Sequence, residues 1–378
     1  KYRKENGILK FVHLADLHLG KRECGFSMLE DQRIILDRIY EIIQEESPDA
    51  VLIAGDVYDK LTPPAEAVTL LDDFLSRLAD QKTEVFIIAG NHDSAERVAF
   101  GSRIMDRSGI HFSPVYNGKT AKFTMTDEYG EVDIHLMPYL RYEEVRRFFK
   151  DEEITNTEQA AAVVVREMDI DESKRNVVVS HQFAAGGLTS DSERNSVGGT
   201  DMVSAEIYAP FDYTALGHLH KPQYMGGNNI RYSGTPLKYS MSEANDKKSV
   251  TIVEMGKKGE PLKITLREPE PLRDMRQLHG SIDELIEGES NDYVSIVLTD
   301  TTRVPDAQTK LRAKYPYLMG MKYEHEMERS EHIINISPDV DTKNPLELFE
   351  EFFKSANGKE MTEKQSGYMQ ELINGIWG

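Results

Sequence analysis

Five short polar motifs follow one another along this chain, and together they carry the side chains of a two-metal site. They are Asp16-Leu17-His18, Gly55-Asp56, Gly90-Asn91-His92-Asp93, His181 and Gly217-His218-Leu219-His220. Seven of these residues offer a carboxylate, amide or imidazole ligand, and His92 is left over. Two six-coordinate cations need about this many ligands if they share one carboxylate and keep positions open for water and a phosphate. The motifs therefore predict hydrolysis of a phosphoester at a pair of divalent cations.

Each motif directly follows an apolar run that has the length and composition of a buried strand. The runs are residues 8–14, 50–54, 85–89, 176–179 and 213–216. Continuous apolar and β-branched runs are typical of strands that are covered on both faces. Open α/β sheets bind ligands at the carboxyl ends of their strands, so we expect the five motifs to meet there. Glycines 55, 90 and 217 are expected to let the chain turn sharply as the strands end.

The residue types narrow the choice of metal. The set mixes oxygen ligands with four imidazoles and has no thiolate, which suits manganese, iron or zinc better than magnesium alone or a closed structural zinc site. We expect two groups of ligands: Asp16, His18, Asp56 and His220 for one cation, and Asp56, Asn91, His181 and His218 for the other. Asp56 would bridge two cations roughly 3.5–4 Å apart, which polarise one phosphate and activate a water for in-line attack.

His92 is the expected catalytic residue, because it could protonate the leaving oxygen or steer the scissile phosphate. Asp59 and Asp93 are expected to support the ligands, and Asp93 to orient the His92 ring. Each motif alone is common, and the other histidines are expected to be ordinary core or surface residues: His13, His111, His135, His279, His325 and His332. What is specific is the conjunction of five motifs, each after its own strand.

The pattern D-x-H, G-D, G-N-H-D, H and G-H-x-H resembles that of the calcineurin-like metallophosphoesterase superfamily. Longer stretches are similar to the SbcD nuclease family, namely residues 13–20, 54–59 followed by Pro63-Pro64, 89–94, 215–221 and 231–236. Ala15 departs from the serine that members of this family often carry, but it lies between ligands and should not remove activity. The similarity runs over most of the chain.

This resemblance implies a DNA nuclease with two divalent cations, Mn²⁺ above all, that works with an SMC-like ATPase of the SbcC type in DNA end processing, repair and recombination. The implied activities are 3′-to-5′ exonuclease on duplex ends, endonuclease on single strands and hairpin opening. A homodimer, formed through a helix that begins near Arg97, is also implied. Two alternatives stay open: a different two-metal phosphoesterase, and a noncatalytic adaptor that positions DNA ends.

The composition is ordinary for a globular protein, but the charge is unusual for one that binds DNA. Of 378 residues, 39% are apolar and 29% charged, and no apolar run approaches the roughly 18 residues of a membrane helix. The single cysteine, Cys24, suits a reducing compartment such as the cytoplasm, and the resemblance implies association with the nucleoid through DNA. The net charge of −20 argues against a DNA-coating protein. We therefore expect weak DNA binding by the isolated chain, through Lys21, Arg22, Arg97 and Arg194.

The remaining patterns predict three parts. Residues 1–270 are expected to form an α/β (α+β) nuclease domain, a two-sheet sandwich flanked by helices at 28–46, 64–78 and 151–168, with strands at 230–232, 249–254 and 262–266 adding the second sheet. The pattern of residues 271–338 predicts a small α+β capping domain, with helices at 281–286 and 305–315 and strands at 293–298 and 318–323. The resemblance implies that this domain helps to choose DNA substrates. Residues 339–378 predict two apolar helices, the second begun by a Thr362–Gln365 capping box, for docking the ATPase.

Overall fold

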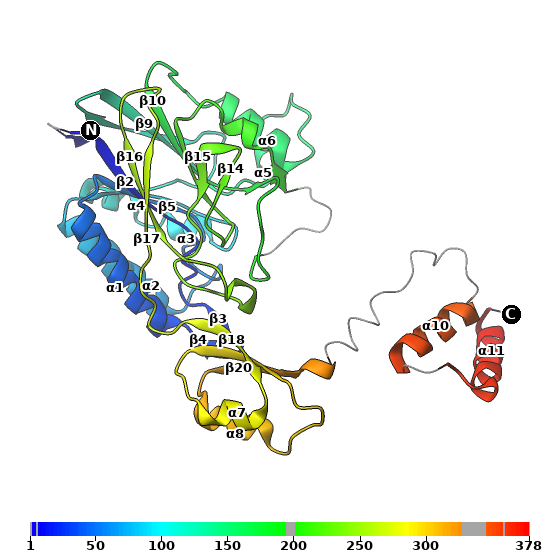
Figure 1. Cartoon of the computed structure of the whole chain (residues 1–378). Coiled ribbons are helices and arrows are strands. Elements are labelled where there is room, and N and C mark those ends of the chain that lie inside the picture. The colour runs from blue at the N-terminus through cyan, green and yellow to red at the C-terminus, as the bar shows by residue number, and fades with distance from the viewer. Residues whose placement is uncertain (1, 5–6, 194–200, 327–344, 358–359, 378) are drawn as a thin grey trace. The chain divides into compact units, whose positions relative to one another are not determined.

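The computed structural model describes residues 2–4, 7–193, 201–326, 345–357 and 360–377 (Figure 1). The chain divides into two compact units, Lys1–Met275 and Arg276–Gly378. The first unit carries all five polar motifs.

The first sheet of this unit has six strands in the order β17-β16-β2-β5-β6-β7. Four of them are parallel: β2 (Leu9–Leu14), β5 (Ala50–Ala54), β6 (Glu84–Ile88) and β7 (Ile110–Phe112). Two are antiparallel additions at the other edge: β16 (Val250–Met255) and β17 (Lys263–Arg267). Helices α1 (Leu29–Glu46) and α2 (Ala65–Asp80) pack on each other, and α2 contacts β6.

The second sheet has seven strands in the order β1-β8-β9-β10-β13-β15-β14. Their bounds are Tyr2–Arg3, Ala121–Asp127, Gly130–Met137, Arg175–His181, Tyr213–Gly217, Gly227–Tyr232 and Gln223–Met225, in that order. Strands β9, β10, β13 and β15 are parallel. The outer face of this sheet packs against helices α5 (Tyr142–Val145) and α6 (Thr157–Arg166), with Val145, Val164 and Val178 in one buried cluster.

The two sheets face each other across a second apolar core. Phe11, Leu52 and Phe86 of the first sheet meet Val179 and Tyr213 of the second. Helices α1 and α2 lie on one side of this sandwich and α5 and α6 on the other (Figure 1). Strand β5 is therefore buried along its whole length, which explains its continuous apolar sequence. The predicted fold class, a two-sheet sandwich flanked by helices, is confirmed.

Two expectations about this unit were wrong, and one feature of it was not predicted. Residues 250–255 and 263–267 extend the first sheet, whereas 230–232 join the second sheet beside β13. The hairpin β8–β9, which supplies two strands of the second sheet, was not predicted. The helix expected over 151–168 begins only at Thr157, because the Asn156 side chain accepts a hydrogen bond from the Gln159 backbone and caps the helix there.

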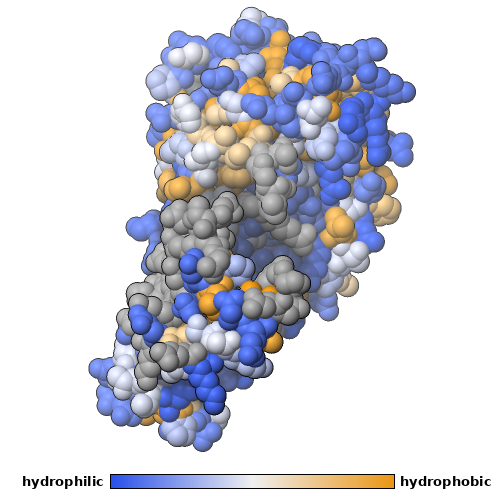
Figure 2. All heavy atoms as spheres, turned by 90° about the vertical axis from the view of Figure 1, so that its right-hand side faces the viewer, coloured by the Kyte–Doolittle hydropathy of each residue, from blue (hydrophilic) through white to orange (hydrophobic). Residues whose placement is uncertain are grey.

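Short elements connect these layers. They are β3 (Arg22–Glu23), β4 (Phe26–Ser27), α3 (Ala95–Val98), α4 (Ser102–Met105), β11 (Phe183–Ala184) and β12 (Met202–Val203), with 3-10 turns at Asp106–Ser108, Ala205–Tyr208 and Met241–Glu243. Within the described chain, every helix is too short or too polar to cross a bilayer. In the view of Figure 2, hydrophilic side chains predominate and hydrophobic ones form small scattered groups.

Among its described residues, the second unit contains a three-stranded sheet, four longer helices and a helical turn at residues 324–326. The sheet has the order β18-β19-β20, with bounds Met275–Gly280, Tyr293–Leu298 and Leu318–Tyr323. The helices are α7 (Ile282–Glu287), α8 (Ala307–Lys314), α10 (Pro345–Asn357) and α11 (Glu363–Trp377). The predicted capping box of α11 is confirmed, because Thr362 N–H donates to Gln365 Oε1 (2.9 Å) and Gln365 N–H to Thr362 Oγ1 (3.4 Å). Residues 327–344 lie outside the described chain.

Candidate metal centre

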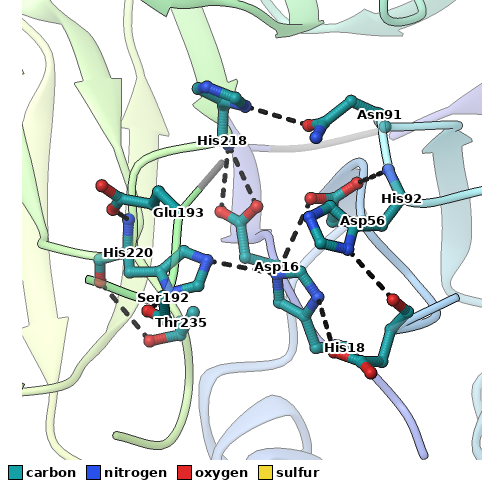
Figure 3. Close-up of polar contacts among 12 residues, drawn as sticks. Asp16, His18, Asp56, Asn91, His92, Ser192, Glu193, His218, His220 and Thr235 are labelled. Carbon is teal, nitrogen blue, oxygen red and sulfur yellow. Dashed lines mark hydrogen bonds and ion pairs between the residues drawn. The ribbon is translucent and has the colours of Figure 1, made fainter. Parts of the chain in front are cut away.

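The structure brings all seven predicted ligands into one cluster at the carboxyl ends of five strands. Strands β2, β5 and β6 of the first sheet lead to Asp16, His18, Asp56 and Asn91, and strands β10 and β13 of the second lead to His181, His218 and His220. Six of these side chains are buried, and Asn91 is partly exposed. Side chains from both sheets therefore point toward one another across the sandwich (Figure 3).

One group of ligands lies on the side of β2. The Nε2 atoms of His18 and His220 are 3.1 Å apart, and His18 Nε2 is 3.6 Å from Asp56 Oδ2. Asp16, His18 and His220 each offer a ligand atom within 4.8 Å of the others. This geometry suits one cation between two imidazoles and two carboxylates.

The other group lies on the side of β6. Asn91 Oδ1 is 2.9 Å from His181 Nε2 and 3.0 Å from His218 Nδ1. Asp56 Oδ2, the same oxygen that faces His18, is 3.5 Å from His181 Nε2. The other oxygen of Asp56 accepts the backbone N–H of His92 (2.8 Å). Asp56 thus has one oxygen fixed by the backbone and one placed between the two groups.

The hydrogen bonds of His181 show that these residues fit cations. Its Nδ1 donates to the Ala54 carbonyl (2.8 Å), so the neutral ring has a lone pair at Nε2. That lone pair faces the oxygens of Asn91 and Asp56, an arrangement that is repulsive unless a proton or a cation lies between them. The His220 ring is oriented in the same way. Its Nδ1 lies 2.6 Å from Ser192 Oγ and 3.3 Å from Glu243 Oε1, which leaves Nε2 available to bind a cation.

The pKa shifts that the protein itself produces at these residues also agree with a site for cations. Burial disfavours a charged ring at His181, but the adjacent Asp56 carboxylate outweighs it and raises the His181 pKa to about 9. Burial lowers the pKa of His218 to about 3, and it also lowers that of His18 and of His220. Burial alone would raise the pKa of Asp56, yet the neighbouring His181 keeps it below its ordinary value. Three imidazoles are therefore neutral and free to ligate, and at His181 a bound cation would replace the proton.

His92 is buried beside these groups, and its ring is held by Asp59 rather than by Asp93. His92 Nδ1 donates to the Asp59 carbonyl (3.0 Å), and the ring packs edge-on against that of His18, 4.8 Å between centroids. The Asp93 carboxylate instead accepts backbone N–H bonds from Val57 (3.0 Å), Tyr58 (2.9 Å) and Gly90 (2.9 Å). Asp93 therefore ties the loop after β5 to the loop after β6, and the expectation that it orients His92 was wrong.

The four residues expected to contact DNA differ in their surroundings. Lys21 is only 9% exposed, and its ammonium lies 3.3 Å from the Asp59 carboxylate, so it neutralises a buried acid instead of presenting a surface charge. Arg22 is exposed and donates to the Gly25 carbonyl (2.6 Å). Arg97 is exposed at the edge of the metal cluster. Arg194 lies outside the described residues.

The backbone at this centre is unusual. Asp16, His18, Asp56 and His218 have φ values of 54°, 44°, 46° and 103°, in the region that side chains other than glycine rarely adopt. Gly55 turns with φ 84°, as predicted. Gly217, by contrast, has no left-handed φ; it is needed because a Cβ there would overlap the Ala54 carbonyl of the opposite sheet. The strained positions belong to ligand loops, as is common at functional sites.

Two acidic residues that the sequence did not reveal support His220. Glu243 is fully buried, and its carboxylate pairs with Lys248 (2.6 Å) as well as with the His220 ring. Glu193 accepts the His220 backbone N–H, and burial raises its pKa to about 7. Both lie in polar segments without a motif, at sequence distances that no spacing rule connects to His220. The only sequence feature that pointed to a buried ion pair near His220 was the charge pattern of residues 243–248, in which acids lie beside lysines.

Two family models and two full-length relatives show the family to which this chain belongs. The calcineurin-like phosphoesterase family matches residues 9–222, and the family described as Type 5 capsule protein repressor C-terminal domain matches residues 271–357. Two relatives, each named as the SbcD component of the nuclease SbcCD, cover 97% of this chain: that of Staphylococcus epidermidis is 30% identical over 99% of its own length, and that of Staphylococcus saprophyticus 31% over 98%. A dimetal phosphatase from Danio rerio covers 70% of this chain and 98% of its own, at 12% identity and a TM-score of 0.44. The chain therefore belongs to the calcineurin-like phosphoesterase family and, within it, to the SbcD proteins.

Proposed function

We propose that this chain is a Mn²⁺-dependent DNA nuclease, the nuclease component of a complex with an SMC-like ATPase of the SbcC type. The observation that carries the proposal is the position of Asp56 Oδ2, 3.6 Å from one imidazole group and 3.5 Å from the other. A bridging carboxylate at this place is what a two-cation phosphodiesterase requires. The relatives' shared name, which makes them part of the nuclease SbcCD, supports a nucleic acid as the substrate.

Asp16, His18, Asp56 and His220 would hold one cation, and Asp56, Asn91, His181 and His218 the other. When bound, the two cations would polarise the scissile phosphate and activate a water for in-line attack. His92 serves as proton donor to the leaving oxygen or as a steering contact to the phosphate. The bond from its Nδ1 to Asp59 fixes the ring and leaves Nε2 to hold or release a proton. Exonuclease, single-strand endonuclease and hairpin-opening activities are part of the proposal.

The partner-binding parts of the proposal are supported by exposed apolar residues. Phe100 and Ile104, beside α3 and on α4, are 82% and 77% exposed, and we assign a homodimer contact to them. Helices α10 and α11 enclose an apolar cleft of about 590 Å³ between Phe349, Phe353 and Tyr368, which suits a helix of the ATPase. Phe352, Ile376 and Trp377 are further apolar residues of these helices, and their side chains lie outside the part of the chain that the structure describes. Residues 1–270, 271–338 and 339–378 are proposed as nuclease, capping and docking parts.

The test is cleavage of end-labelled duplex and hairpin DNA by the purified chain with Mn²⁺, next to Mg²⁺ and an Asp56→Ala control. Mn²⁺-dependent cutting that the variant lacks, with both cations lost from it, is the expected result. Loss of only one cation would mean that Asp56 does not bridge. Full nuclease activity in His92→Ala would remove the role given to that residue. Hydrolysis of a generic phosphodiester without any cutting of DNA, with or without the ATPase, would mean a different phosphoesterase.

A further inference from the structure

A cleft of about 600 Å³ opens directly beside the metal centre, and arginines and aromatic side chains line it. Gly90 and Asn91, from the ligand loop after β6, form one end of it. Tyr139 lines it as well, and its ring meets that of the ligand His181 edge-on, 6.2 Å between centroids. A molecule bound in this cleft would therefore lie next to the phosphate held at the metals.

Three arginines line the cleft: Arg97, Arg141 and Arg147. All three are exposed, and none has an ion pair with any residue that the structure describes. This is notable in a chain of net charge −20, in which arginines such as Arg77, Arg166 and Arg267 are tied to carboxylates. Unpaired guanidinium groups gathered at one place are suited to phosphate oxygens.

Three carboxylates also line the cleft, so the formal charge of its side chains is close to zero and a net positive charge there would come from the proposed cations. Both oxygens of Asp93 are occupied by backbone N–H groups, as described above. Glu96 accepts a hydrogen bond from the Ser94 hydroxyl (2.9 Å). Glu144 is the remaining carboxylate of the lining. Two divalent cations at the adjacent centre would add about +4 that the sequence charge omits.

Aromatic side chains form another wall of the cleft. Tyr116 and Phe148 pack edge-to-face with centroids 5.7 Å apart, and Phe148 is 48% exposed although it is large and apolar. Exposed rings beside cationic side chains are the combination that binds single-stranded nucleic acid, because unpaired bases stack on the rings while arginines contact the phosphates. The bases of an intact duplex are stacked on one another and cannot use such a wall.

We infer that this cleft binds the unpaired strand that runs away from the scissile phosphate, with its phosphates on Arg97, Arg141 and Arg147 and its bases on Tyr116 and Phe148. The inference rests on the proposed nuclease function and deepens it. It explains how an acidic chain handles opened ends and hairpin loops: exposed arginines, set beside the proposed cations, contact the phosphates directly. It also predicts that the isolated chain prefers single strands to blunt duplexes.

The test is fluorescence anisotropy of the full chain with a short oligothymidylate and a blunt duplex, in EDTA so that neither is cut. Phe148→Leu should weaken oligothymidylate binding about five- to hundredfold, the effect of one stacked base, and leave duplex binding unchanged. Arg147→Gln should reduce the slope of log K against log salt by about 0.7. Arg146→Gln is the matched control, since Arg146 is an exposed neighbour that does not line the cleft.

With Mn²⁺, the Phe148→Leu and Arg147→Gln variants should hydrolyse bis(p-nitrophenyl) phosphate as fast as wild type, because neither residue contacts a side chain that is proposed to bind a cation. Unchanged oligothymidylate binding in both variants, or equal losses for single strand and duplex, would overturn the inference while leaving the nuclease proposal intact if wild type still cuts DNA. A wild type that hydrolyses the small diester but neither binds nor cuts DNA would overturn both.

Discussion

Replacing Gly217 with alanine tests whether the contact between the two sheets sets the geometry of the metal centre. Gly217 ends β13, and a Cβ there would overlap the Ala54 carbonyl at the end of β5 and lie 2.8 Å from His181 Nδ1. Those two groups form the 2.8 Å hydrogen bond that fixes which nitrogen of His181 faces the metals. The new methyl group would therefore press on both partners of the bond at once.

The size of the disturbance follows from these distances. Ordinary contacts of a Cβ begin at 3.4 Å, so His181 Nδ1 must move by at least 0.6 Å. Metal sites tolerate errors of only about 0.5 Å in their ligands. Overpacking of this kind costs about 1–3 kcal/mol of unfolding free energy, and misplacing His181 should weaken Mn²⁺ binding at one of the two proposed cation sites by about tenfold or more.

Urea unfolding and calorimetric titration with Mn²⁺ measure the two effects separately. Gly320→Ala is the matched control, because Gly320 also lies in a strand and a Cβ there meets only Ser295 Oγ at 3.8 Å. The control should retain wild-type affinity for both cations. If Gly217→Ala also binds two Mn²⁺ ions as tightly as wild type, the sheets can slide apart without cost, and our account of the centre as rigidly spaced by backbone contact is refuted.

Two further perturbations test the surroundings of the ligands and the pH dependence of stability. Glu243→Gln keeps the shape of the side chain but removes the carboxylate next to His220. Calorimetry should show that Mn²⁺ affinity at one of the two proposed sites is about 10–100-fold lower than in wild type. Wild-type Mn²⁺ affinity at both sites would contradict this role for Glu243. Burial opposes a charged ring at His111, but hydrogen bonds to Glu84 and Asp106 outweigh it and raise the His111 pKa. The stability from this ring is thus fully present below the ordinary histidine pKa of about 6.5 and is lost as pH rises through the raised value. The unfolding free energy lost in His111→Gln should be larger at pH 5.5 than at pH 8.5, and a loss that does not vary with pH would contradict the assignment.

The sequence predicted the fold class and the strand ends that carry the ligands, because both depend on local patterns. Strand β5 needs continuous apolar residues, and its end at Ala54 follows from Gly55. Sheet membership could not be predicted in this way. Residues 250–255 have the same apolar character whichever sheet they join, and their pairing beside β2 depends on contacts far away in the sequence.

In the candidate site, too, features that depend on local motifs could be predicted from the sequence, and features that depend on distant contacts could not. Its ligands lie in motifs, so their types and order were visible, and the structure brings them together; the Mn²⁺ titrations above test their assignment to two cations. The roles of Asp93 and Glu243 were not visible, since each acts through backbone or ring atoms of residues on other strands. Lys21 was misjudged for a related reason: a lysine beside a ligand loop looks exposed in sequence, yet a buried acid, Asp59, draws it inward.

The left-handed backbone at the ligand loops has a consequence for how this protein can change over generations. Asp16, His18, Asp56 and His218, which are proposed to bind cations, also occupy positive φ. Asparagine, aspartate and histidine are the side chains other than glycine that best tolerate this region, and glycine itself has no ligand atom. Exchanges at these four positions are therefore restricted to a few residue types, even where a glutamate or cysteine could reach the same metal. The intervening Leu17 and Leu219, which are buried but carry no such constraint, are free to drift among apolar residues of similar volume.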